Sequence, residues 1–167
     1  APPAPDRREI EIKLPLPDAA AGERILLQAG FRVTRPRTFE DNTLFDTPDG
    51  RLRAASTVLR VRQAGRRATL TYKGPPTPGR YKDREELETT LGDPAAFTAI
   101  LHRLGYVAAF RYQKYRTEFT DGQGAATLDE TPVGCYLELE GAPEWIDAAA
   151  GRLALRHAAD RVSGGHV

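Results

Sequence analysis

Residues 57–73 read TVLRVRQAGRRATLTYK, and this stretch decides the fold of the chain. Apolar and polar residues alternate in 57–63 and again in 67–73, and a period of two is typical of β-strands. The dipeptide Ala64-Gly65 lies between the two alternating segments, which is the arrangement of a β-hairpin. The stretch therefore predicts two neighbouring antiparallel strands.

The same alternation recurs on both sides of this hairpin. Further strands are predicted at residues 8–14, 39–46, 83–91, 110–119, 125–130 and 135–140. Helices are predicted at 18–29, 93–104 and 143–162, where Asp18, Pro94 and Pro143 mark the starts. The strands and helices together predict an α+β fold, and eight strands can close into a barrel. We expect an eight-stranded antiparallel β-barrel flanked by about three helices.

Composition limits the class of protein. The 167 residues are enough for one ordinary hydrophobic core. The 24 Lys and Arg residues nearly balance the 23 Asp and Glu residues, which excludes a polybasic arm and an acidic tail. The single cysteine excludes a disulfide framework and a multi-cysteine metal site. No membrane span or signal peptide is visible. We therefore expect a cytoplasmic protein with one domain at 8–163, a disordered lead-in at 1–7 and a tail at 164–167.

Sorting the strand residues by face separates apolar side chains from charged ones. One face carries residues such as Ile10, Leu59 and Leu139. The other face is almost entirely charged, with Glu9, Glu11, Lys13, Arg60, Arg62, Lys73, Arg84, Glu86, Glu88, Lys114, Arg116, Asp129, Glu138 and Glu140. If the helices cover the apolar face, the charged face lines the interior of the barrel as a tunnel.

The kinds of charge on this face point to a chemistry. Arginine carries a planar fork of donors that suits phosphate. The carboxylates recur as pairs two residues apart, for example Glu9 with Glu11 and Glu138 with Glu140. Such pairs repel unless a cation lies between them, and Mg²⁺ and Mn²⁺ prefer carboxylate oxygens and bridge to phosphates. The face therefore indicates a phosphate-rich anion bound together with a divalent metal.

The order of several motifs resembles the CYTH family, whose members are also called triphosphate tunnel metalloenzymes. Residues 9–13, EIEIK, match the ExExK signature at the start of the family. The other motifs follow in family order as LFDTPDGRL at 44–52, LRVR at 59–62, LTYKGP at 70–75, REELE at 84–88, KYR at 114–116 and LDETPVGCYLELEG at 128–141. The family includes class IV adenylate cyclases, thiamine triphosphatases and inorganic triphosphatases, and its fold is an eight-stranded antiparallel tunnel.

The resemblance also implies roles for individual residues. A triphosphate would be bound by Arg60, Arg62, Lys73, Arg84, Lys114 and Arg116. Mg²⁺ or Mn²⁺ would be held by Glu9, Glu11, Asp129, Glu138 and Glu140, some of them through water. Lys13 would lie near the reacting phosphate, so Lys13 and Glu11 are the candidate catalytic residues. Glu86 and Glu88 would line the tunnel, where they bind metal or orient basic side chains.

These expectations favour an enzyme that hydrolyses inorganic triphosphate or a nucleoside triphosphate with a divalent metal. No purine pocket is visible in the sequence, although Tyr112 shares a face with Lys114 and could contact a base or simply fill the tunnel. One alternative is a cyclase that converts ATP into cyclic AMP and pyrophosphate, because a different register of the triphosphate would serve that reaction. Another is a polyphosphate- or nucleotide-binding module without turnover, against which the complete acidic set argues.

A nucleic-acid-binding sheet is disfavoured, because such a sheet interleaves aromatic residues with its basic ones. Here most aromatic residues are predicted on the opposite face. The expected partner is a small-molecule triphosphate, with no nucleic acid and no membrane, and we expect a monomer or a homodimer.

Overall fold

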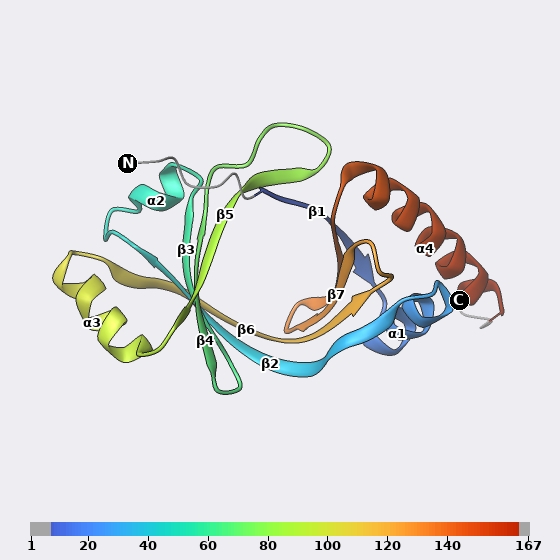
Figure 1. The fold of residues 1–167 in the computed structure, drawn as a ribbon, viewed down its shortest axis with the longest axis horizontal. Helices are drawn as coiled ribbons and strands as arrows, with labels where there is room; N and C mark the ends of the chain where they lie inside the picture. Colours follow the sequence, from blue (N-terminus) through green and yellow to red (C-terminus); the bar gives the residue numbers. More distant parts are fainter. Residues whose placement is uncertain (1–7, 164–167) are drawn as a thin grey trace. The chain divides into compact units, whose positions relative to one another are not determined.

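A computed structural model describes residues 8–163, with side chains described up to Ala154. The predicted lead-in at 1–7 and tail at 164–167 lie outside the described residues. The strands are β1 (Arg8–Leu16), β2 (Arg32–Asp46), β3 (Val58–Ala64), β4 (Arg67–Lys73), β5 (Lys82–Leu91), β6 (Val107–Thr120), β7 (Ala125–Thr131) and β8 (Gly134–Glu140). The helices are α1 (Ala19–Gln28), α2 (Arg51–Ala54), α3 (Pro94–Arg103) and α4 (Pro143–Ser163) (Figure 1).

The eight strands form a closed barrel in the order β1-β5-β4-β3-β2-β6-β7-β8. The registered pairs are antiparallel, including β3 with β4 and β7 with β8. The predicted α+β fold with an eight-stranded antiparallel barrel is therefore confirmed. Within the described residues, no helix combines the length and apolar character that a membrane crossing requires.

The structure differs from the prediction at two elements. Strand β2 begins at Arg32 rather than at residue 39. Its first half contains Pro36, which lacks a backbone donor and obscures a strand pattern. The second difference is α2, a helix of four residues that raises the number of helices to four. Backbone N–H groups of Leu52 and Arg53 donate to the carboxylate of Asp46, so a contact from the end of β2 holds this helical turn.

The chain divides into two compact units, and the boundaries between them fall within β1, β2 and β6. Among the described residues, unit 1 holds Phe39–Gln113 together with Arg8 and Glu9. Its core is built from Phe45, Val61 and Leu101, against which Leu59, Leu70, Leu91, Phe97 and Tyr106 pack. The apolar face of the β3–β4 hairpin thus packs against α3, and the charged face lies on the other side of the sheet.

Unit 2 holds Ile10–Thr38 and the chain from Lys114 onward. Helices α1 and α4 contact each other, and they also contact β7 and β8 respectively (Figure 1). The fully buried core residues include Leu26, Leu139 and Ile146. Tyr115 of β6 is 38% exposed, and its ring lies under the guanidinium of Arg37.

Candidate active site

Unit 1 buries three of the predicted phosphate-binding residues on neighbouring strands. Arg60 lies on β3, Lys73 on β4 and Arg84 on β5, and their exposed fractions are 8%, 7% and 8%. The register explains why they share a face: Arg60 pairs with Thr71, two residues before Lys73, and Lys73 pairs with Glu86, two residues after Arg84. Three cations are thereby concentrated in a partly desolvated part of the sheet.

The two arginines of this group each have an unused buried donor. The Nε atoms of Arg60 and Arg84 are buried and have no hydrogen-bond partner among the described residues. Arg60 donates a long hydrogen bond to the Thr71 hydroxyl at 3.4 Å. That hydroxyl in turn donates to Glu88 Oε2 at 3.0 Å, so Glu88 acts on the arginine indirectly. A buried N–H donor without an acceptor is costly, so this geometry suits a ligand with anionic oxygens.

Arg62 is held from β2 by two residues that the sequence did not single out. Its Nε donates to Oδ1 of Asn42 at 2.7 Å and lies 3.2 Å from Oε1 of Glu40. Asn42 is fully buried, and its Nδ2 has no hydrogen-bond partner within the described part of the chain. Both partners lie on the face of β2 that pairs with the arginine face of β3, because Asn42 is directly opposite Arg62.

Lys73 lies between two carboxylates whose pKa values move in opposite directions. Its ammonium donates to Oε1 of Glu9 at 2.7 Å and lies 3.3 Å from Oε2 of Glu86. Burial acts to raise the pKa of Glu9, but a hydrogen bond from Glu86 and the charge of Lys73 lower it to about 2. Burial and the hydrogen bond to anionic Glu9 raise the pKa of Glu86 to about 7. Glu9 therefore stays anionic, whereas Glu86 keeps its proton up to neutral pH.

Unit 2 carries a second cluster, centred on Asp129. Lys114 donates to Oδ2 of Asp129 at 2.8 Å, and Arg116 makes a bidentate pair with the same carboxylate at 2.7 and 2.8 Å. Arg116 also lies 3.5 Å from Glu138. Burial acts to raise the pKa of Asp129, but the hydrogen bond and charge of Arg116 hold it below its usual value. Asp129 thus fixes the positions of two basic side chains.

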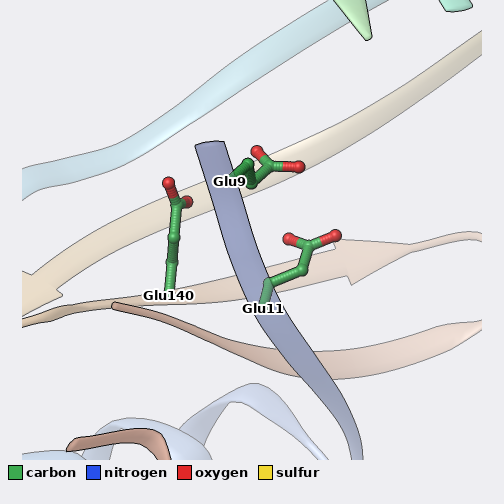
Figure 2. A group of neighbouring side chains, drawn as sticks. All are labelled: Glu9, Glu11 and Glu140. Atoms are coloured by element: carbon green, nitrogen blue, oxygen red, sulfur yellow. The ribbon is translucent and has the colours of Figure 1, made fainter. Parts of the chain in front are cut away.

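Three glutamates form the one acidic group whose geometry suits a metal among the described residues. Glu9 and Glu11 come from β1 and Glu140 from β8, and one carboxylate oxygen of each lies within 4.8 Å of the others (Figure 2). Glu11 and Glu140 are directly opposite each other in the β1–β8 pairing. Oxygen donors of this kind fit a hard divalent cation such as Mg²⁺ or Mn²⁺. The fit supports the predicted metal dependence without identifying the metal.

The remaining predicted residues are not members of this acidic group. Asp129 and Glu138 belong to the ion pairs with Arg116, so their role as metal ligands stays a prediction. Lys13 is exposed, and its ammonium lies 4.6 Å from the ring centroid of Tyr136. Its catalytic role, like that of Glu11, also stays a prediction.

A pocket of about 580 Å³ opens in unit 1 beside these basic residues. Arg84 and Lys82 contribute to its wall, and most of the remaining lining is apolar, including Leu44, Val58 and Phe110. The sequence did not predict this pocket. Its walls come from separate strands and loops, which only the strand register brings together.

The comparisons with known proteins agree with this geometry. A family model described as the CYTH domain matches residues 7–155. "Putative adenylate cyclase" of Methanocaldococcus jannaschii is 29% identical over 133 residues, which are 79% of this chain and 75% of that protein.

Solved structures share the fold at lower sequence identity. A "putative adenylate cyclase" from Vibrio parahaemolyticus superposes with a TM-score of 0.75 at 20% identity, over 91% of this chain and 89% of that one. A "putative adenylyl cyclase" from Hippeastrum, described as revealing a dominant triphosphatase activity, superposes with a TM-score of 0.68 at 20% identity, over 95% of this chain and 97% of that one. Because the family model spans most of its length, this chain belongs to the CYTH domain family.

Proposed function

We propose that this protein is a divalent-metal-dependent enzyme that hydrolyses a triphosphate. The observation that carries the proposal is the pair of buried arginines, Arg60 and Arg84, whose Nε atoms lack any partner in the described chain. A triphosphate carries about four negative charges at neutral pH, and its oxygens would accept these unused donors. In a partly desolvated site such charge-assisted contacts are stronger than in water.

The basic residues would bind the triphosphate as two groups. Arg60, Lys73 and Arg84 present cations on one face of β3, β4 and β5. Arg62 is aimed by Asn42, and Arg116 and Lys114 are aimed by Asp129. Because the carboxylate and amide partners fix these side chains before the substrate arrives, little rotamer freedom would be lost on binding.

Glu9, Glu11 and Glu140 would hold the divalent cation, and Asp129 and Glu138 are further candidates. A bound Mg²⁺ or Mn²⁺ would withdraw charge from phosphate oxygens and lower the pKa of a nearby water. The residues of the chain would keep the terminal phosphorus in line with that water. Water attacks the phosphorus, the P–O bond to the leaving diphosphate breaks, and orthophosphate is released.

The adenylate cyclase activity is the second candidate. The M. jannaschii relative carries that name, and the Hippeastrum protein carries it together with a dominant triphosphatase activity. In a cyclase the ribose 3′-hydroxyl attacks the α-phosphorus and pyrophosphate leaves. The two reactions use the same kinds of residues but place different phosphorus atoms at the reacting position.

The test is a product analysis of the purified protein with tripolyphosphate, ATP and thiamine triphosphate, each with Mg²⁺, with Mn²⁺ and with a chelator. We expect orthophosphate that depends on the metal and is lost in Glu11→Ala and Arg60→Ala. Formation of cyclic AMP and pyrophosphate from ATP would show that the protein is a cyclase and not a hydrolase. Tight triphosphate binding that needs no metal and leads to no product would leave only a binding module.

A further inference from the structure

Arg8 binds both sides of the connection between β4 and β5. It is the first described residue of β1 and directly precedes Glu9. Its Nε donates to Oδ1 of Asp83 at 2.9 Å, and its Nη2 donates to Oγ1 of Thr77 at 2.8 Å. Thr77 and Asp83 are themselves joined by an isolated antiparallel bridge, in which the Thr77 N–H donates to the Asp83 carbonyl at 2.6 Å. We call these three residues the Arg8 clip.

The segment that accepts the hydrogen bonds of Arg8 is stiff. Residues 75–78 read PPTP, and a proline ring fixes the backbone angle φ on both sides of Thr77. Nearer the strands, the Gly74 N–H donates to the carbonyl of Glu85 at 2.9 Å. The connection therefore presents a fixed pair of acceptors, which suits the rigid fork of donors of a guanidinium.

The next residue of β1 binds the same hairpin from its other face, because successive strand side chains lie on opposite faces. The carboxylate of Glu9 accepts a hydrogen bond from Lys73, whose cross-strand partner is Glu86. The start of β1 is thus attached to β4 and β5 on both faces, once through Arg8 and once through Glu9.

The ion pair between Arg8 and Asp83 adds little to the stability of the fold. The two side chains are 38% and 34% exposed, and water screens an ion pair of this kind. The pair acts on geometry instead, because the ends of strands open most readily and Glu9 lies one residue from the start of β1. Groups that hold a metal ligand in place change metal affinity by about 10–100-fold, although they do not touch the ion.

We propose that Arg8 is a positioning residue for the divalent metal. Through Thr77 and Asp83 it holds the start of β1, so that Glu9 keeps its place in the group of three glutamates (Figure 2). This inference rests on the proposed function, in which that group binds Mg²⁺ or Mn²⁺. It adds to the site a residue whose own side chain contacts neither the metal nor the triphosphate.

The experiment measures Mn²⁺ binding to the substrate-free protein, from the loss of the electron paramagnetic resonance signal of free Mn²⁺. Arg8→Ala should raise the Kd for Mn²⁺ by about tenfold. Asp83→Ala should act in the same direction, and the double variant should bind no more weakly than Arg8→Ala, because both changes break the same contact. Arg8→Lys keeps the charge without the fork and should restore only part of the affinity.

Kinetics and thermal denaturation distinguish positioning from a structural role. Arg8→Ala should raise the Mg²⁺ concentration that gives half the maximal rate, whereas kcat at saturating Mg²⁺ should stay within about twofold of the wild type. Its melting temperature without metal should fall by less than about 4 °C. A larger fall together with a lower kcat would assign Arg8 a structural role and overturn the inference.

Arg111→Ala is the matched control, because Arg111 is another exposed arginine of unit 1 that pairs with an aspartate, Asp41, from a different strand. It should leave the Kd for Mn²⁺ unchanged, and an equal rise in this control would overturn the inference.

The inference and the proposed function can fail separately. An unchanged Kd for Mn²⁺ in Arg8→Ala would overturn the role of Arg8 while metal-dependent hydrolysis stands. Weaker Mn²⁺ binding in Arg8→Ala, in a protein that turns over no triphosphate, would end the hydrolysis proposal and keep the role of Arg8. A wild type that binds no Mn²⁺ would overturn both.

Discussion

Asn42 accepts a hydrogen bond from Arg62 Nε at 2.7 Å while its own amide nitrogen, fully buried, has no partner among the described residues. The oxygen of this amide accepts a hydrogen bond from an arginine, whereas its N–H donors meet no acceptor in the described part of the chain. Buried polar groups are normally hydrogen-bonded, and leaving one without a partner costs about 1–3 kcal/mol. A phosphate oxygen would satisfy this donor, which makes Asn42 a candidate substrate contact as well as a support for Arg62.

Asn42→Asp separates these two roles because the side chains have the same shape. The aspartate still accepts from Arg62, with added charge attraction, but it cannot donate to a phosphate and it repels one. We expect the Kd for Mg²⁺–tripolyphosphate to rise by about ten- to hundredfold, in keeping with the loss of a hydrogen bond to a charged group. The melting temperature without ligand should stay level or rise. An unchanged Kd would show that Asn42 only orients Arg62.

Arg60→Met tests whether the buried guanidinium serves binding rather than stability. Methionine fills a similar volume and removes a desolvated charge that has no ion-pair partner among the described residues, so the ligand-free protein should melt at the same temperature or higher. The Kd for Mg²⁺–tripolyphosphate should rise at least about tenfold, because a charge-assisted contact is lost. Isothermal calorimetry and thermal denaturation measure the two effects.

The control for this variant is Arg66→Met, since Arg66 is an exposed arginine in the turn between β3 and β4. It should leave both quantities unchanged. A large loss of stability in Arg60→Met with little change in affinity would assign Arg60 a structural role instead.

Much of the barrel could be predicted because apolar and charged residues alternate along each strand and so show its two faces. The 57–73 hairpin, for example, has Leu59 and Val61 on one side and Arg60 and Arg62 on the other, and these alternations correspond to β3 and β4. Helix α2 has no such local sequence pattern. Its four residues are too few for a helical period, and it depends on Asp46 accepting their N–H groups.

The candidate site could be predicted less completely, because part of it depends on pairing between strands. Charged residues such as Arg60 and Lys73 stand out on their own strands. Asn42 is uncharged, and its importance comes from lying opposite Arg62, which is visible only in the register of β2 and β3. Leu44 and Val58 likewise look like ordinary strand residues until the same register places them beside the cations.

Glu86→Gln tests the raised pKa of Glu86 through the pH dependence of stability. The pKa of Glu86 is raised to about 7, so between its ordinary value and 7 the folded state binds a proton that the unfolded state has released. Stability from this group is therefore complete at low pH and is lost as the pH rises through about 7. Glu9, whose pKa is lowered to about 2, contributes in the opposite direction and only at lower pH.

Thermal denaturation from pH 4 to 8 measures this effect. The wild type should lose melting temperature between about pH 5 and 7, by about 2–4 °C for each kcal/mol. Glu86→Gln carries no titrating group at this position and should lose that slope. Glu85→Gln, on the other face of β5, should keep the wild-type profile. A slope that persists in Glu86→Gln would place the proton on another group.

Gly124→Ala tests how the start of α4 is fixed in unit 2. A Cβ atom at Gly124 would lie 2.5 Å from two ring atoms of Trp145, closer than real contacts allow. The indole has little room to give way, because its Nε1 donates to Asp121 at 2.8 Å and its ring meets Phe31 edge-on at 6.2 Å. We expect a loss of about 1–3 kcal/mol, as for other overpacked cores.

Gly92→Ala is the matched control, since a Cβ atom at Gly92 would meet no atom within 4 Å. Its melting temperature should stay near that of the wild type, whereas Gly124→Ala should melt several degrees lower. Because Gly124 and Trp145 are not among the residues proposed to bind the substrate or the metal, the Kd for Mg²⁺–tripolyphosphate below the melting transition should change by less than about threefold. Equal melting temperatures for the two variants would mean that the indole moves aside without cost, and Trp145 would then not be the anchor of α4.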